Sequence, residues 1–214
     1  MKLVLLGDTY VGKTSITERL CKNRFSESKE STIGAAYSSV SFDLPNSKVK
    51  MEIWDTSGQE RYKSLTPMYY RGADVVLIVF DLSNTNTHNE INYWMKMMKH
   101  LEVNTNNIYI VGNKSDLVDI NQADIDDKTV VGVTDKYPDI KFYKVSAKTG
   151  VRITELFTNV AERLIEIESI RKENEIKRQS IVDLNRNRNG NGNGNGNGNG
   201  NSQGNIFSYC SCSF

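Results

Sequence analysis

The sequence predicts an α/β protein, a three-layer sandwich in which helices cover both faces of a six-stranded, mostly parallel sheet with one antiparallel edge strand. Short apolar runs alternate along the chain with longer amphipathic segments, the order that produces parallel sheets flanked by helices. Two runs, Asp74–Phe80 and Ile108–Val111, are apolar almost throughout, as in strands covered on both faces. Ligands bind at the carboxyl ends of the strands in such folds, so the segments after the strands are the candidate sites.

Each element follows from its apolar pattern. The predicted strands are Leu3–Leu6, Val40–Leu44, Val49–Trp54, Asp74–Phe80, Ile108–Val111 and Phe142–Val145. Pro45-Asn46-Ser47 is a turn signal between two alternating segments, and the resulting hairpin supplies the antiparallel edge. Apolar residues at helical spacing predict the helices Ser15–Cys21, Asn89–Leu101 and Ile153–Ile170. The cluster Met95–Met98 is interpreted as core packing.

Composition narrows the class of protein. The chain has 214 residues, enough for one domain with a tail or for two small domains. Its 27 basic and 26 acidic residues nearly cancel, so the net charge of the chain gives no electrostatic attraction to nucleic acid. The apolar run before Gly7 is too short for a signal peptide. The sequence contains no run of about 18 apolar residues, which is the length needed to span a membrane. Three cysteines (Cys21, interpreted as a core residue, with Cys210 and Cys212) make no disulfide framework, so a reducing compartment is expected.

The composition changes after about Arg171. We expect a domain over residues 1–170 and a tail over 171–214, in which charged residues give way to an Asn-Gly repeat from Asn189 to Asn201. Burial of so few apolar residues cannot offset the conformational entropy lost on ordering. We therefore predict that Gln179–Phe214 is a flexible coil with a root-mean-square end-to-end distance of roughly 30–36 Å. The repeat is either an expansion without function or a binding segment, and the first is favoured.

A phosphate-binding loop follows the first strand and precedes a helix. It is formed by Gly7, Asp8, Thr9, Tyr10, Val11, Gly12, Lys13 and Thr14, with Ser15 directly after it. The glycines let backbone N–H groups surround phosphate oxygens, and the helix N-terminus adds its positive dipole end. Lys13 is expected to reach the β and γ phosphates, and the Thr14 hydroxyl to ligate Mg²⁺. This loop predicts a nucleoside triphosphate without specifying its base.

The segment after the Val49–Trp54 strand carries groups suited to metal binding and hydrolysis. Asp55 is predicted to hold magnesium through its water shell. Gly58 can bring its N–H against the γ phosphate, and Gln59 can orient a water for in-line attack. Asp55 as an ordinary strand end is the alternative, which the phosphate loop disfavours.

Two further loops predict guanine as the base. Asn113-Lys114-Ser115-Asp116 follows one strand, and Ser146-Ala147-Lys148 follows the next. The Asp116 carboxylate can accept from the N1 and N2 donors of guanine, whereas adenine would leave it unpaired. Backbone N–H groups of the second loop can donate to the guanine O6. Each segment alone is a weak signal, but their order and spacing behind the phosphate loop specify guanine.

With these motifs in order, the chain resembles the Ras superfamily of P-loop NTPases and, within it, the Rab family. The segments on which the resemblance rests are GDTYVGKT, Thr32 in the STIG stretch, WDTSGQE, NKSD and SAK. The resemblance covers about residues 1–168. The segments ESTIGAAY and EIWDTSGQERYKSLTPMYYRGAD are most similar to the early-endosomal Rab branch.

The resemblance implies roles for further residues. Phe25 would pack against guanine, and Thr32 would ligate Mg²⁺ and contact the γ phosphate. Tyr37, Trp54 and Tyr69 would form the aromatic triad offered to effectors, although phenylalanine is commoner at the first of these positions. GTP with Mg²⁺ would order the segments 26–36 and 57–71, and hydrolysis would release them.

Two departures leave the hydrolysis rate open. Ser57 stands where alanine is usual and adds a hydroxyl, and Thr9 can crowd Gln59. A nucleotide-holding scaffold with little hydrolysis is therefore the alternative to a cycling GTPase. A metabolic P-loop kinase is a third reading, disfavoured because no arginine-rich lid is evident and NKSD argues against adenine.

The C-terminus predicts a lipid anchor. Cys210 and Cys212 resemble the paired cysteines that Rab proteins geranylgeranylate, although two residues follow the pair, and unmodified thiols are the alternative. The resemblance implies a monomer on the cytoplasmic face of an intracellular membrane, endosomal by preference, with a cytosolic pool. Its expected partners are effectors, a guanine-nucleotide exchange factor, a GTPase-activating protein and prenyl-dependent escort or dissociation-inhibitor proteins.

Overall fold

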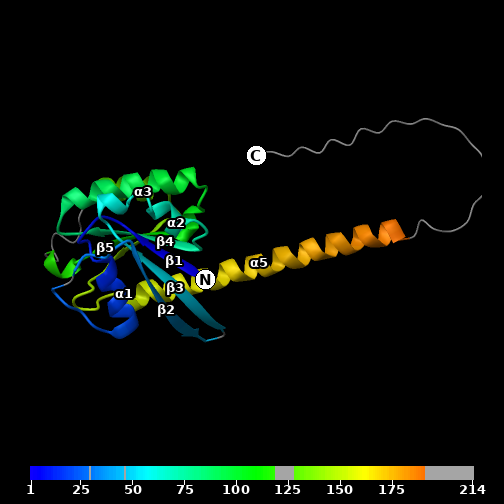
Figure 1. The fold of residues 1–214 in the computed structure, drawn as a ribbon, viewed down its shortest axis with the longest axis horizontal. Helices are drawn as coiled ribbons and strands as arrows, with labels where there is room; N and C mark the ends of the chain where they lie inside the picture. The colour runs from blue at the N-terminus through cyan, green and yellow to red at the C-terminus, as the bar shows by residue number, and fades with distance from the viewer. Residues whose placement is uncertain (29, 46, 119–127, 191–214) are drawn as a thin grey trace, which may run out of the picture. The chain divides into compact units, whose positions relative to one another are not determined.

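The computed structural model describes residues 1–28, 30–45, 47–118 and 128–190. The chain divides into two compact units, Met1–Arg171 and Lys172–Phe214. The first contains a six-stranded sheet with strand order β2-β3-β1-β4-β5-β6 (Figure 1). The strands are β1 (Lys2–Leu6), β2 (Ala35–Leu44), β3 (Ser47–Thr56), β4 (Val75–Asp81), β5 (Ile108–Asn113) and β6 (Lys141–Lys144).

The pairing of the strands confirms the predicted fold class. Only β2 and β3 pair antiparallel, with Leu44 opposite Ser47 at the hairpin end. β1 pairs parallel to both β3 and β4, and β5 pairs parallel to both β4 and β6. All six predicted strands are present, and β2 begins five residues earlier than Val40 because its exposed N-terminal half lacks the apolar alternation used for prediction.

Helices pack on both faces of the sheet. They are α1 (Lys13–Lys22), α2 (Thr66–Tyr70), α3 (Asn89–His100), α4 (Lys128–Lys136) and α5 (Ile153–Gly190), with short 3₁₀ turns η1 (Glu60–Tyr62), η2 (Thr85–His88), η3 (Thr105–Asn107) and η4 (Ser115–Leu117). Alternate residues of β1 face opposite sides. Leu3 and Leu5 pack with α1 and α5 in a first core cluster, and Val4 and Leu6 pack with α3 and α4 in a second core cluster. The core role predicted for Met95 and Met98 is confirmed.

The helix α4 shows why some elements escape prediction. Its sequence KTVVGVTDK contains a glycine and several β-branched residues, which are poor helix formers. Val130 and Val133 are nonetheless buried against the second core cluster. Tertiary packing therefore overrides local propensity here.

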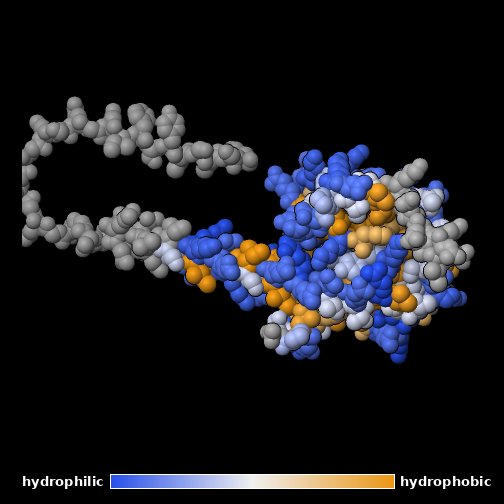
Figure 2. Space-filling model, turned by 180° about the vertical axis from the view of Figure 1, so that it is seen from behind, coloured by the Kyte–Doolittle hydropathy of each residue, from blue (hydrophilic) through white to orange (hydrophobic). Residues whose placement is uncertain are grey.

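The last helix is longer than predicted. The sequence predicted an end at Ile170 and a flexible coil from Gln179, but α5 continues to Gly190. Residues 171–180 are all exposed, so apolar burial does not explain the extension. The segment is rich in Arg, Lys, Glu and Gln, which favour helix, and Glu173 stands four residues before Lys177. Figure 2 shows hydrophobic residues interspersed with hydrophilic ones along this part of the helix.

No helix within the described ranges is both long enough and apolar enough to cross a membrane. The predicted repeat and the two C-terminal cysteines lie outside the described residues, apart from the first asparagine and glycine of the repeat. Cys21 is partly buried against the first core cluster, and burial raises the pKa of its thiol.

Candidate nucleotide-binding site

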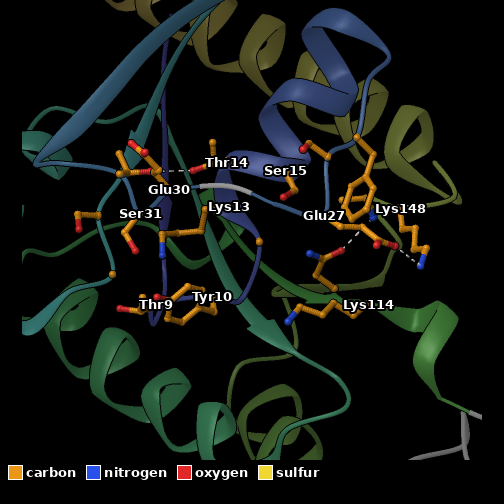
Figure 3. A pocket seen from close by; sticks show the side chains of 18 of the residues that line it. Thr9, Tyr10, Lys13, Thr14, Ser15, Glu27, Glu30, Ser31, Lys114 and Lys148 are labelled. Atoms are coloured by element: carbon orange, nitrogen blue, oxygen red, sulfur yellow. Dashed lines mark hydrogen bonds and ion pairs between the residues drawn. The ribbon is translucent and has the colours of Figure 1, made fainter.

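A pocket of about 390 Å³ lies among the loops that follow β1, β3, β5 and β6. Most of the predicted nucleotide-binding residues line it: Thr9, Tyr10, Gly12, Lys13, Thr14, Ser15, Phe25, Thr32, Gly58, Gln59, Asn113, Lys114, Asp116, Ala147 and Lys148. Gly7, Asp8, Val11 and Ser146 belong to the same loops, and Asp55 lies near the end of β3, but these five residues do not line the pocket. Figure 3 shows Lys114 and Lys148 on one side and Thr9, Glu30 and Ser31 on the other.

The phosphate loop requires glycine at both of its fixed positions. Gly7 and Gly12 have φ angles of 143° and 95°, which side-chain-bearing residues rarely adopt. A Cβ atom on Gly7 would stand 2.1 Å from the Val79 carbonyl oxygen. One on Gly12 would stand 2.3 Å from Asn113 Nδ2. The loop therefore lies directly against the ends of β4 and β5.

Lys13 is a buried cation at the centre of the loop. Its side chain is 5% exposed, and Nζ donates to the carbonyl oxygens of Gly7 at 2.8 Å and Asp8 at 2.6 Å. Burial lowers the pKa of the ammonium group to about 8, although Asp55 and Asp8 oppose the shift. Because Lys13 is buried, the attraction between its ammonium group and a bound phosphate would be strong.

Three oxygen-bearing side chains from separate elements converge beside Lys13. The Thr14 hydroxyl donates to Asp55 Oδ2 at 2.6 Å and lies 2.9 Å from the Thr32 hydroxyl. They come from α1, β3 and the segment before β2. Mg²⁺ takes oxygen ligands and commonly uses few protein side chains together with substrate phosphates. The donor set therefore fits magnesium, and these are the residues predicted for it.

The segment after β3 packs closely against the phosphate loop. A Cβ atom on Gly58 would stand 2.3 Å from the Asp8 carbonyl carbon and the Thr9 nitrogen, so only glycine fits there. The Ser57 hydroxyl accepts from the backbone N–H of Gln59 at 3.3 Å, so the hydroxyl that replaces the usual alanine bonds within its own segment. The Gln59 amide oxygen accepts from Arg61 Nε at 2.6 Å. Gln59 lines the pocket but is bound to its own segment.

Asn113 connects three loops of the site. Its Nδ2 donates to the Val11 carbonyl at 2.9 Å, and its Oδ1 accepts from the Ala147 N–H at 3.0 Å. The side chain is 2% exposed. One amide group therefore holds the phosphate loop together with the two loops predicted to bind the base, which are residues 113–116 (the first base-binding loop) and 146–148 (the second).

Asp116 lies at the edge of the pocket, where a base could reach it. Ser146 donates to Asp116 Oδ1 at 2.5 Å, and the Thr149 N–H donates to the same serine hydroxyl at 3.1 Å. Asp116 itself is exposed. The second base-binding loop therefore orients the carboxylate that the sequence predicts to select guanine.

Several residues of the site were missed by the sequence prediction. Arg19 donates to the carbonyl oxygens of Ala147 at 2.8 Å and Lys148 at 2.6 Å. Glu27 lies 2.8 Å from Lys148 Nζ across the rim of the pocket. Nothing local in the sequence indicates these long-range contacts. Asp81 carried a signal, because it is a charged residue at the end of an apolar strand, the place where ligands bind.

The three predicted effector residues come together outside the pocket. The ring centroids of Tyr37 and Trp54 are 5.6 Å apart, and those of Trp54 and Tyr69 are 5.9 Å apart. Tyr37 is 55% exposed, and the other two rings are partly buried. Lys2 Nζ lies 5.3 Å from the Trp54 ring, within range of a cation–π contact.

The fold and the site together define a P-loop nucleotide-binding protein. A sequence model described as "Ras family" matches residues 2–166. The chain is 43% identical over 166 residues to the putative ras-related protein Rab-5B of Dictyostelium discoideum, which covers 77% of this chain and 75% of that protein. It is 42% and 40% identical over 164 residues to the ras-related proteins RABF2b and RABF2a of Arabidopsis thaliana, in each case over 76% of this chain and 80% of the relative.

The chain therefore belongs to the Ras family of small GTPases and, within it, to the Rab proteins. Members of this family bind GTP and GDP with Mg²⁺, hydrolyse GTP and work with effectors, exchange factors and activating proteins. The predicted family, fold and enzyme class are confirmed, and vesicle trafficking is the process in which such proteins act.

Proposed function

We propose that this chain is a membrane-anchored switch that cycles between GTP and GDP and recruits effectors while GTP is bound. The observation that carries the proposal is the convergence of Thr32 with Thr14 and Asp55. Thr32 belongs to the predicted switch segment 26–36, and the other two belong to the fixed part of the site. A segment held at that point through the γ phosphate would be released when the phosphate leaves.

In the proposed mechanism, Lys13 and the backbone N–H groups of the phosphate loop bind the phosphates. When bound, Mg²⁺ would be held by Thr14, Thr32 and, through water, Asp55, and would neutralise charge that develops on the phosphate oxygens. Gln59 would orient the attacking water after its amide leaves Arg61. Among the described residues no arginine lines the pocket, so unaided turnover should be slow, and a GTPase-activating partner would add about 10³–10⁵ in rate.

Single-turnover hydrolysis of bound GTP tests the role of Gln59. The Gln59→Leu variant should hydrolyse GTP at least about 10-fold more slowly than the wild type, because its side chain cannot hydrogen-bond water. Gln179→Leu, at an exposed position of α5, is the matched control and should change nothing. Equal rates for Gln59→Leu and wild type would remove Gln59 from the mechanism. Negligible hydrolysis by the wild type itself would favour the scaffold alternative, which Ser57 and Thr9 leave open.

Guanine specificity is tested by analysis of the nucleotide that co-purifies with the protein. GDP or GTP is expected, because the Asp116 carboxylate pairs with the N1 and N2 donors of guanine. Bound ATP would overturn the assignment of the base.

We further propose that Cys210 and Cys212 both carry geranylgeranyl groups. One lipid chain gives only marginal membrane binding, whereas two anchor a protein stably. Escort and dissociation-inhibitor proteins would then maintain a cytosolic pool. Intact mass of the protein purified from its native cells should contain two added isoprenoids, and an unmodified mass would contradict the proposal.

The similarity to a relative named Rab-5B supports an endosomal membrane as the site of action. A tagged chain in its own cells should label endosomes, and Cys210→Ser with Cys212→Ser should disperse the label into the cytosol. Wild-type label confined to another compartment would contradict the endosomal assignment.

A further inference from the structure

Asp81 is a buried carboxylate beside the first base-binding loop, and the proposed mechanism does not use it. It ends β4, stands opposite Asn113 in the pairing of β4 with β5, and is 6% exposed. A buried charge is costly unless it is paired and hydrogen-bonded, so its partners indicate its role.

The two carboxylate oxygens of Asp81 have different partners. Oδ1 accepts from the backbone N–H of Ser83 at 2.9 Å and from the Ser83 hydroxyl at 2.7 Å. Oδ2 lies 2.7 Å from Lys114 Nζ. One oxygen therefore orders the turn that follows β4, and the other reaches across to the NKSD loop.

The backbone of Asp81 is fixed by η2. Its N–H donates to the Thr87 hydroxyl at 3.1 Å, and its carbonyl oxygen lies 3.0 Å from His88 Nε2, which donates to it. Thr87 and His88 are both buried. The carboxylate therefore projects from a rigid support, which is the condition for positioning another side chain accurately.

Lys114 is the residue that this carboxylate holds. Its backbone adopts a left-handed conformation with φ of 62°, uncommon for a lysine, and its side chain is 32% exposed where it lines the pocket. In Figure 3 the side chain lies extended along the edge of the pocket. A lysine stem presents apolar methylene groups on which a flat base can pack while the ammonium is held elsewhere.

We infer that Asp81 is a positioning residue for guanine-nucleotide binding, holding the Lys114 ammonium so that the lysine stem forms a fixed wall of the pocket. The inference rests on the proposed function, because the wall serves a nucleotide in this pocket. Removing the pairing charge lets the stem move, and each bound nucleotide then leaves faster. GDP and GTP are affected alike, because the wall lies with the first base-binding loop and both nucleotides carry the same base.

The test is the release rate of a fluorescent GDP analogue from the full-length protein in excess unlabelled GDP. Asp81→Asn retains an oxygen for Ser83 and removes the charge that pairs with Lys114. We expect it to release GDP about 5- to 20-fold faster. This is the effect of losing one charge-assisted hydrogen bond, reduced because Lys114 is partly exposed. Ser83→Ala, the matched control, removes only a hydroxyl on the other oxygen and should change the rate less than about twofold.

A double-mutant cycle separates positioning from a purely structural role. Lys114→Met retains the stem without the ammonium and should also release GDP faster, and adding Asp81→Asn to it should then have little further effect. An equal effect of Asp81→Asn in both backgrounds would show that Asp81 acts only on its own turn and would overturn the inference. If Asp81→Asn does not fold, a wild-type release rate for Lys114→Met overturns it instead. Failure of the wild-type protein to retain GDP would refute the proposed function itself.

Discussion

Replacing Asn113 by alanine should weaken both the fold and the nucleotide site, because one buried amide serves three loops. The substitution leaves the Val11 carbonyl and the Ala147 N–H without the partner that each has now, and both residues are almost fully buried. An unsatisfied buried polar group costs about 1–3 kcal/mol. Two such groups give about 2–6 kcal/mol, a large part of the roughly 5–15 kcal/mol by which domains are stable.

Urea unfolding of the nucleotide-free protein, followed by far-ultraviolet circular dichroism, measures this loss. Asn113→Ala should lower the free energy of unfolding by at least about 2 kcal/mol. Asn92→Ala, at an exposed position of α3, is the matched control and should change it by less than about 0.5 kcal/mol. A loss below about 0.5 kcal/mol for Asn113→Ala would refute the argument that this amide joins the loops. GDP release from the variant should accelerate in parallel, since the same bond positions the base-binding loops.

Three further predictions concern the charges and the close contacts of the pocket. Burial lowers the pKa of Lys13 to about 8 from an ordinary value of 10.5. The folded, nucleotide-free protein then holds fewer protons than the unfolded chain between these pH values, and its free energy of unfolding should rise with pH there by up to about 1.4 kcal/mol per unit. Urea titrations at pH 7.5 and 9.5 check this, and an identical rise in Lys13→Met would assign it elsewhere. Asp116→Asn should accelerate GDP release about 100-fold or more while improving competition by xanthine nucleotides, because an amide can donate to the xanthine C2 oxygen; unchanged competition would contradict the base assignment. Gly58→Ala should reduce single-turnover GTP hydrolysis at least about 10-fold, because its Cβ would collide with backbone 2.3 Å away, whereas a rate within about twofold of wild type would show that the loop relaxes freely.

Much of the site was predictable because its chemistry is encoded in short segments. Gly7, Gly12 and Lys13 act through backbone conformation and a single charge, both of which local sequence specifies. The strands were predictable because short apolar runs, and segments in which apolar and polar residues alternate, are both typical of strands. The trio proposed to bind the metal was assembled from separate motifs plus one residue, Thr32, that only the family resemblance assigned.

Other features depend on residues distant in sequence and could not be predicted in this way. The helix α4 forms because two valines find a hydrophobic partner surface, against the preference of its own residues. Arg19 contacts a loop more than a hundred residues away. The extension of α5 through residues 171–180 is the opposite case, because the Arg, Lys and Glu residues of that segment favour a helix by their own propensity, which does not require tertiary contacts.

The sequence by itself determined the class of ligand, the order of the strands along the chain and the residue types that a guanine-nucleotide site requires. These follow from local backbone geometry, from the period of apolar residues and from the hydrogen-bonding groups of individual side chains. Only the tertiary structure decided which of these groups meet and what holds them in place. Asn113 bridging three loops, and Asp81 holding Lys114, exist because the parallel sheet brings the ends of β4 and β5 together with the loop after β1. Side-chain contacts over such distances depend on the packing of the whole domain, which no local pattern records.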